Sequence, residues 1–123
     1  GGLAVGRLRY YDTEQRRAGL PRDVAALVRG LDAESVTVSL VNLSVRHTRE
    51  VVIGAGSFGE HRFTSVREIS ADGSSGEAQQ VHGPWLNVKL PPGSEIELEL
   101  GMERHCRQPT YAFPWHGDTI PVR

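Results

Sequence analysis

Acidic and apolar residues alternate between Glu95 and Met102, in the order EIELELGM. Successive side chains of a β-strand point to opposite faces of a sheet, so a strand here has one apolar face and one acidic face. Acidic residues two positions apart on a strand lie about 6.8 Å from each other, which favours a solvated outer face over a cation site. The segment therefore predicts a half-buried strand of an antiparallel sheet.

Four further segments have the composition and alternation of strands. They are residues 35–43, 49–53, 60–69 and 81–90. Polar or proline-rich turns connect them, at residues 44–48, 70–80 and 91–94. Short strands joined by short turns predict an all-β chain, an antiparallel β-sandwich of the immunoglobulin-like or jelly-roll-like kind over residues 31–123.

The first thirty residues have a different pattern. Asp23 stands where a helix N-cap would, an apolar run follows at residues 24–28, and Gly30 comes just after it. This arrangement predicts one short N-terminal helix of about two turns. We expect residues 1–30 to form an arm or linker before the sandwich.

Composition excludes several classes of function. The chain has 123 residues, enough for one core, and 14 Lys+Arg against 15 Asp+Glu give a net charge of -1. That balance provides no field for nucleic acid, and no apolar run reaches the length of a membrane span. Cys106 is the only cysteine, and the five histidines lack metal-ligand spacing. We expect no bound metal, no cofactor, no nucleic acid and no membrane.

The segment VVIGAGSFG at residues 51–59 matches G-x-G-x-x-G at Gly54, Gly56 and Gly59. In a dinucleotide-binding fold these glycines approach the pyrophosphate, and Asp72 lies near the distance expected for a ribose ligand. The residues after Gly59 are bulky and β-favouring, however, and a parallel sheet needs crossover helices that this chain does not offer. A glycine-rich turn or bulge between strands is the better interpretation.

Aromatic residues gather in the last third of the chain and suggest a carbohydrate-binding group. Flat rings stack on sugar faces, and amide or guanidinium groups bind the hydroxyls. The candidate residues are Trp85, Asn87, Arg107, Gln108, Tyr111 and Trp115. The other interpretation is that the rings fill the ends of the sandwich or pack on a neighbouring domain.

Two stretches carry a resemblance to a known family. Residues 36–43 (VTVSLVNL) contain a V-x-L-x-N strand, and residues 90–100 (LPPGSEIELEL) contain an L-x-P-G-x-x-x-x-L turn and strand. They resemble the C-terminal β-sandwich accessory modules of bacterial carbohydrate-active enzymes. The resemblance covers about a fifth of the chain. It implies a module without catalytic residues that packs on a catalytic domain or helps to hold a glycan.

These observations predict a non-catalytic accessory module of a larger bacterial protein rather than an enzyme. The chain begins at Gly1 rather than Met, which fits a part of a longer protein. The expected partner is a neighbouring domain of the same parent, and a glycan is the alternative ligand.

Overall fold

The computed structural model describes residues 8–31, 34–56, 60–70, 76–103, 114 and 120–122. Within these residues the chain forms ten β-strands and no α-helix. The strands are β1 (Leu8–Asp12), β2 (Arg17–Ala18), β3 (Val24–Leu31), β4 (Ser35–Asn42), β5 (Arg49–Ala55), β6 (Arg62–Ile69), β7 (Gln79–Gly83), β8 (Trp85–Leu90), β9 (Glu95–Glu103) and β10 (Ile120–Val122). The all-β prediction is confirmed.

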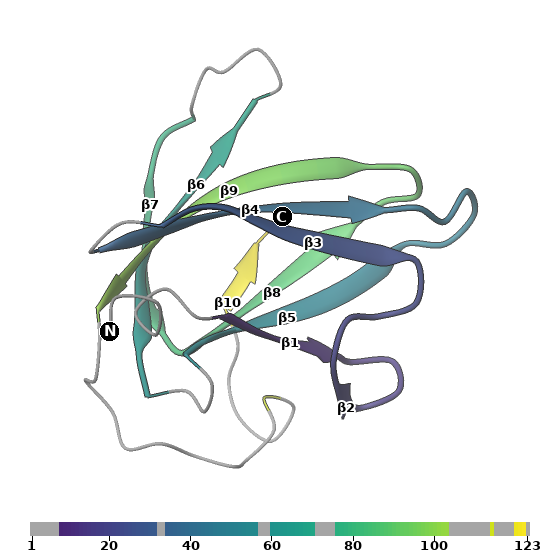
Figure 1. Cartoon of the computed structure of the whole chain (residues 1–123), viewed down its shortest axis with the longest axis horizontal. Helices are drawn as coiled ribbons and strands as arrows, with labels where there is room; N and C mark the ends of the chain where they lie inside the picture. The colour runs from purple at the N-terminus through teal and green to yellow at the C-terminus, as the bar shows by residue number, and fades with distance from the viewer. Residues whose placement is uncertain are drawn as a thin grey trace.

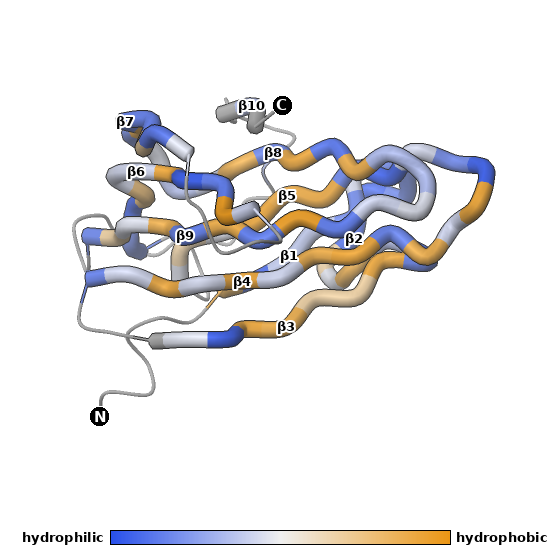
Figure 2. Tube along the Cα trace, turned by 90° about the horizontal axis from the view of Figure 1, so that it is seen from above, coloured by the Kyte–Doolittle hydropathy of each residue, from blue (hydrophilic) through white to orange (hydrophobic). Residues whose placement is uncertain are grey.

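The strands form two facing sheets (Figure 1). The order is β10-β8-β5-β1-β2 in the first sheet and β3-β4-β9-β6-β7 in the second. All neighbouring strands are antiparallel except β10, which runs parallel to β8. Figure 2 shows β3 at one edge of the molecule and β7 and β10 at the opposite edge. The predicted pair of antiparallel sheets is therefore confirmed.

Apolar side chains from both sheets fill the space between them. Large, fully buried members of this core include Leu40, Ile53, Phe63, Leu86 and Leu98. They alternate along their strands with residues on the outer faces, as the period of two requires. Removing this apolar surface from water is the main favourable contribution that holds the two sheets together.

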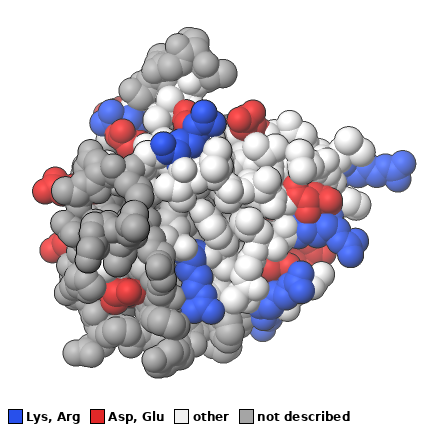
Figure 3. Space-filling view, viewed as in Figure 1, with Lys and Arg blue, Asp and Glu red and all other residues white. Residues whose placement is uncertain are grey.

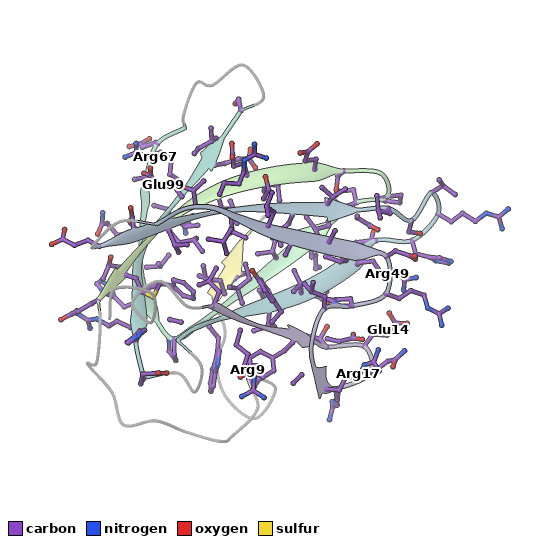
Figure 4. All side chains as sticks on the ribbon, viewed as in Figure 1. Arg9, Glu14, Arg17, Arg49, Arg67 and Glu99 are labelled. Atoms are coloured by element: carbon purple, nitrogen blue, oxygen red, sulfur yellow. The ribbon has the colours of Figure 1, made fainter. Side chains whose placement is uncertain are left out.

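The alternation predicted between Glu95 and Met102 is confirmed in β9, where every apolar member of the segment is buried. The outer face of this strand is neutralised by arginines from other strands. Glu97 Oε1 lies 3.4 Å from Arg29 Nε, and Glu99 Oε1 lies 3.8 Å from Arg67 Nη1 (Figure 4). The outer acidic row is thus part of a mixed-charge surface.

The prediction of a short helix after Asp23 is wrong. Residues 24–31 form β3, which pairs antiparallel with β4 along its length. The same apolar run also fits a period of two, with Val24 and Ala26 packed on the core and Leu27 on the other face. A two-turn helix is marginal by itself, whereas pairing with β4 satisfies the backbone of this run. Residues 8–30, the described part of the expected arm or linker, contribute β1, β2 and all of β3 except Leu31 to the two sheets.

Candidate functional site

Two of the six predicted carbohydrate-binding residues, Trp85 and Asn87, lie on β8. They alternate with the core residues Leu86 and Val88, so both side chains point away from the core. This side of the first sheet is called the outer face below. The remaining candidates lie outside the described residues: Arg107, Gln108, Tyr111 and Trp115.

Strand pairing brings further side chains beside Trp85 and Asn87. The register of β1, β5 and β8 gives two rows across the outer face of the first sheet. One row is Arg9–Gly54–Trp85, and the next is Tyr11–Val52–Asn87. Tyr11 and Val52 are buried but lie outside the core between the sheets. The outer face therefore combines aromatic, amide and guanidinium groups on a rigid three-stranded frame.

Gly54 makes room for two aromatic rings on the outer face. A Cβ atom at this position would lie 3.3 Å from Tyr11 Cε2 and 3.4 Å from Trp85 Cδ1. Both distances are tight for carbon–carbon contact, so a side chain at Gly54 would push the rings aside. The glycine thus allows Tyr11 and Trp85 to converge over β5.

The glycine motif has a structural rather than a nucleotide-binding geometry. Gly54 lies inside β5, which extends two residues beyond the predicted end at residue 53. Gly56 has a φ of 83°, a conformation that glycine adopts without steric cost, and it ends the strand. β5 pairs antiparallel with β1 and β8, whereas the dinucleotide-binding alternative requires a parallel sheet with crossover helices. The structure contradicts that alternative; Gly59 and Asp72 lie outside the described residues.

Burial and charge act together on Tyr11. Burial raises the pKa of the Tyr11 hydroxyl; the charge of Arg9 and its hydrogen bond partly offset this effect, and Glu60 adds to it. The Arg9 guanidinium carbon lies 5.4 Å from the centre of the Tyr11 ring, within the range of a cation–π contact. Arg9 therefore fixes the tyrosine in place while keeping a positive charge on the outer face.

Two polar atoms on the outer face are buried without a hydrogen-bond partner among the described residues. They are the indole Nε1 of Trp85, a donor, and the amide Oδ1 of Asn87, an acceptor. Leaving such an atom unpaired costs roughly 1–3 kcal/mol.

Histidine and acidic side chains are the usual protein ligands of metal ions. Of the five histidines, His61 is buried and His47 and His82 are exposed, while His105 and His116 lie outside the described residues. No group of three or more His, Cys, Asp or Glu side chains in the described part of the chain is arranged to hold a metal ion.

A second surface feature follows β3. The exposed large hydrophobic residues of the described chain are Leu27, Val28, Leu43 and Val45, with exposed fractions between 39% and 85%. The amide of Leu43 donates a 2.7 Å hydrogen bond to the carbonyl of Asp23, which places the turn after β4 beside the start of β3. We call these four residues the β3 strip.

The side of the molecule that carries the edges of β3 and β1 has little charge between its upper and lower rims. Figure 3 views it with the edges of β3 and β1 toward the reader, and its central described surface is mostly uncharged, with basic atoms in its lower part. Half-buried apolar side chains of β1, of β3 and of the segment between β2 and β3 pack on the core. They are Leu8, Tyr10, Leu20 and Ala26.

Sequence reasoning missed Arg9 and Tyr11 on the outer face and the whole β3 strip. The alternation of β8 was enough to place Trp85 and Asn87 on one face. The position of Tyr11 depends on its pairing with Val52, forty-one residues away in sequence. The register of β1 on β5 cannot be predicted from the residues near Tyr11 alone.

We found no match between this chain and any protein-family model, any curated protein or any solved structure. The described residues also contain no helix with the length and apolar character needed to cross a membrane.

Proposed function

We propose that this chain is a non-catalytic β-sandwich accessory module, immunoglobulin-like or jelly-roll-like, that packs on a neighbouring domain of a larger protein. The observation that carries the proposal is the β3 strip, in which the exposed large hydrophobics of the described chain gather on one strand and the turn beside it. Leu27 and Val28 present apolar side chains on both faces of this edge strand, and exposed apolar residues gathered at one edge favour an interaction site.

The position of the strip suits a contact between domains. β3 is an edge strand of the second sheet, so its outer backbone groups are available for pairing. The surface beside this edge carries little charge (Figure 3). Interfaces between domains have this composition, an apolar centre surrounded by charges at the rim.

A triple substitution tests this proposal. Leu27→Ser, Leu43→Ser and Val45→Ser replace exposed side chains, so the isolated chain is expected to keep its stability within about 0.5 kcal/mol per site. In the parent protein, the same substitutions should expose the module to limited proteolysis and lower the melting temperature of the neighbouring domain.

The matched control is the triple variant Glu77→Ser, Gln80→Ser and Lys89→Ser, which changes three exposed polar residues away from β3. It should leave the parent protein unaffected. Equal behaviour of the two triple variants in the parent would overturn the interdomain role.

A second candidate function is carbohydrate binding by the outer face. It is favoured by the half-exposed Trp85 ring and by the unpaired polar atoms of Trp85 and Asn87, which sugar hydroxyls match in chemistry. Indole rings that stack on a sugar change their fluorescence, so titration with a panel of neutral oligosaccharides provides the test.

A saturable change that disappears in Trp85→Phe and weakens in Asn87→Ala supports binding at the outer face. Lys89→Ala, on the same face of β8, is the control and should bind normally. No response to any sugar, or an unaltered response in Trp85→Phe, rules this site out.

A further inference from the structure

The end of the sandwich beside the β1–β2 turn contains a polar cavity of about 110 Å³. Its lining consists entirely of charged and amide-bearing residues: Asp12, Glu14, Gln15, Arg22 and Arg49. Arg49 stands at the start of β5, and Figure 4 shows it at the same end of the molecule as Glu14 and Arg17. A space of this size holds several water molecules or part of a small polar ligand.

Asp12 places a buried carboxylate in this cavity, with 3% of its side chain exposed. Its Oδ1 accepts hydrogen bonds from the backbone N–H of Glu14 (3.0 Å) and of Gln15 (3.3 Å). Its Oδ2 lies 3.7 Å from Arg17 Nε, beyond hydrogen-bond length, and makes no hydrogen bond to another described residue. The second carboxylate oxygen is thus an available acceptor.

Arg49 contributes a guanidinium group to the same lining. Its Nη1 binds Glu14 Oε2 at 3.1 Å and its Nη2 binds Asp23 Oδ2 at 3.2 Å, so both terminal nitrogens are engaged. Its Nε is buried and has no partner among the described residues. The guanidinium therefore connects the β1–β2 turn to the start of β3.

The backbone around the cavity adopts an uncommon conformation at two positions. Arg16 has a φ of 52° and Asp23 a φ of 67°, and they are the non-glycine residues with positive φ in the described chain. Arg16 lies in the turn that carries Glu14 and Gln15, and Asp23 follows Arg22. Backbone strain of this kind persists where the surrounding structure fixes it, and it is concentrated at ligand-binding sites.

The charges of the lining select the ligand. Asp12 and Glu14 disfavour an anion, and Arg22 and Arg49 disfavour a cation. An apolar group would leave the buried donors and acceptors unpaired. A hydroxyl group donates to a carboxylate and accepts from a guanidinium, so a pair of neighbouring hydroxyls satisfies both sides. We propose that this cavity binds a neutral polyhydroxy compound through two adjacent hydroxyl groups, as on the edge of one sugar residue.

This site is separate from the β3 strip and from the outer face, and it does not depend on the interdomain role. The test is an amide NMR titration of the folded chain with methyl glycosides of glucose, galactose and mannose, and with glycerol. The backbone amides of Glu14 and Gln15 report directly on the Asp12 carboxylate. We expect saturable shifts of these two amides and of the Arg49 Nε resonance.

Two variants distinguish binding from a general perturbation. Asp12→Asn retains the Oδ1 acceptor of the turn but replaces the free oxygen with a donor, and Arg22→Ala removes an exposed side chain at the rim. Each should weaken binding at least about tenfold. Arg29→Ala, an exposed arginine on β3 outside this lining, is the control and should bind as the unchanged chain does.

Three outcomes overturn the proposal. They are the absence of shifts with every polyhydroxy compound, equal binding by Arg22→Ala, and saturable shifts at Glu14 and Gln15 with inorganic phosphate in place of the glycosides. A response of Trp85 fluorescence without shifts at Glu14 and Gln15 would assign sugar binding to the outer face instead.

Discussion

The side-chain amide of Asn42 donates a hydrogen bond of 2.9 Å to the backbone carbonyl of Leu90. The same nitrogen donates to the carbonyls of His47 and Pro91, and Asn42 Oδ1 accepts from the amide of Ser44. Asn42 is fully buried and comes from the second sheet, whereas Leu90 ends β8 of the first. One side chain thus ties together two turns and both sheets.

Replacing Asn42 with Ala should therefore destabilise the fold strongly. The substitution removes these hydrogen bonds and leaves buried carbonyl groups without a donor, for an expected loss of about 2–4 kcal/mol. Urea unfolding followed by circular dichroism measures it. Leu43→Ala, at the adjacent exposed position, is the control and should change stability by less than about 0.5 kcal/mol. Equal stabilities of the two variants would contradict the role given to Asn42.

Gly54→Val should disturb the outer face. The added side chain meets Tyr11 and Trp85 at distances that leave no room, and overpacking of this kind costs about 1–3 kcal/mol. The near-ultraviolet circular dichroism of the aromatic residues should change as well. Gly30→Ala is the matched control, because its Cβ would lie 3.9 Å from the nearest atom, Thr37 Oγ1. A stable Gly54→Val protein with an unchanged aromatic spectrum would refute the close approach of the rings.

Arg49→Gln should destabilise the chain more than Arg67→Gln. The Arg49 side chain is 12% exposed and binds two carboxylates, whereas Arg67 is 39% exposed and lies 3.8 Å from its partner. We expect a loss of about 1–2 kcal/mol for Arg49→Gln and less than about 0.5 kcal/mol for Arg67→Gln. Thermal unfolding at low and high salt measures both. If Arg67→Gln proves the more destabilising, the assigned contribution of the Arg49 ion pairs is wrong.

Alkaline pH should weaken the fold through Tyr10. Burial raises the pKa of the Tyr10 hydroxyl above its ordinary value of 10.0. The unfolded chain therefore ionises first, so this contribution to stability is fully present below pH 10 and is lost as pH rises through the folded-state pKa. Tyr10→Phe should lose less stability than the unchanged chain between pH 9 and pH 11, values that bracket the tyrosine pKa of about 10. Tyrosinate absorbance and urea unfolding at each pH measure the difference, and parallel curves for the two proteins would contradict it.

The contrast between β9 and β3 explains how much of the fold was predictable. In β9 apolar residues occupy every second position, with acidic residues or Gly101 between them, and this period of two is incompatible with the face of a helix. In residues 24–28 five apolar residues follow one another, and such a run fits either a short helix or a strand. The pairing of Val24 with Asn42 and of Val28 with Val38 decided in favour of a strand.

Two of the candidate site residues could be placed on one face from the sequence, because Trp85 and Asn87 are two positions apart on a strand. The neighbours of these residues could not be placed. The register of β1 on β5 brings Tyr11 beside Trp85 and Asn87. Gly54 is important because it leaves room for the Tyr11 and Trp85 rings, and not because it belongs to the G-x-G-x-x-G motif. The cavity at Asp12 likewise depends on Arg49, which is distant in sequence.

By itself, the sequence determined the all-β class, the alternation that gives β9 its buried and solvated faces, and the absence of a global charge that would attract nucleic acid. These properties depend on local periodicity and composition. The tertiary structure alone decided that β3 is a strand, that Tyr11 and Trp85 meet over Gly54, and that Arg49 faces a buried Asp12 across a polar cavity. Each of these results depends on pairing between distant strands, whose register is set by the packing of the whole core.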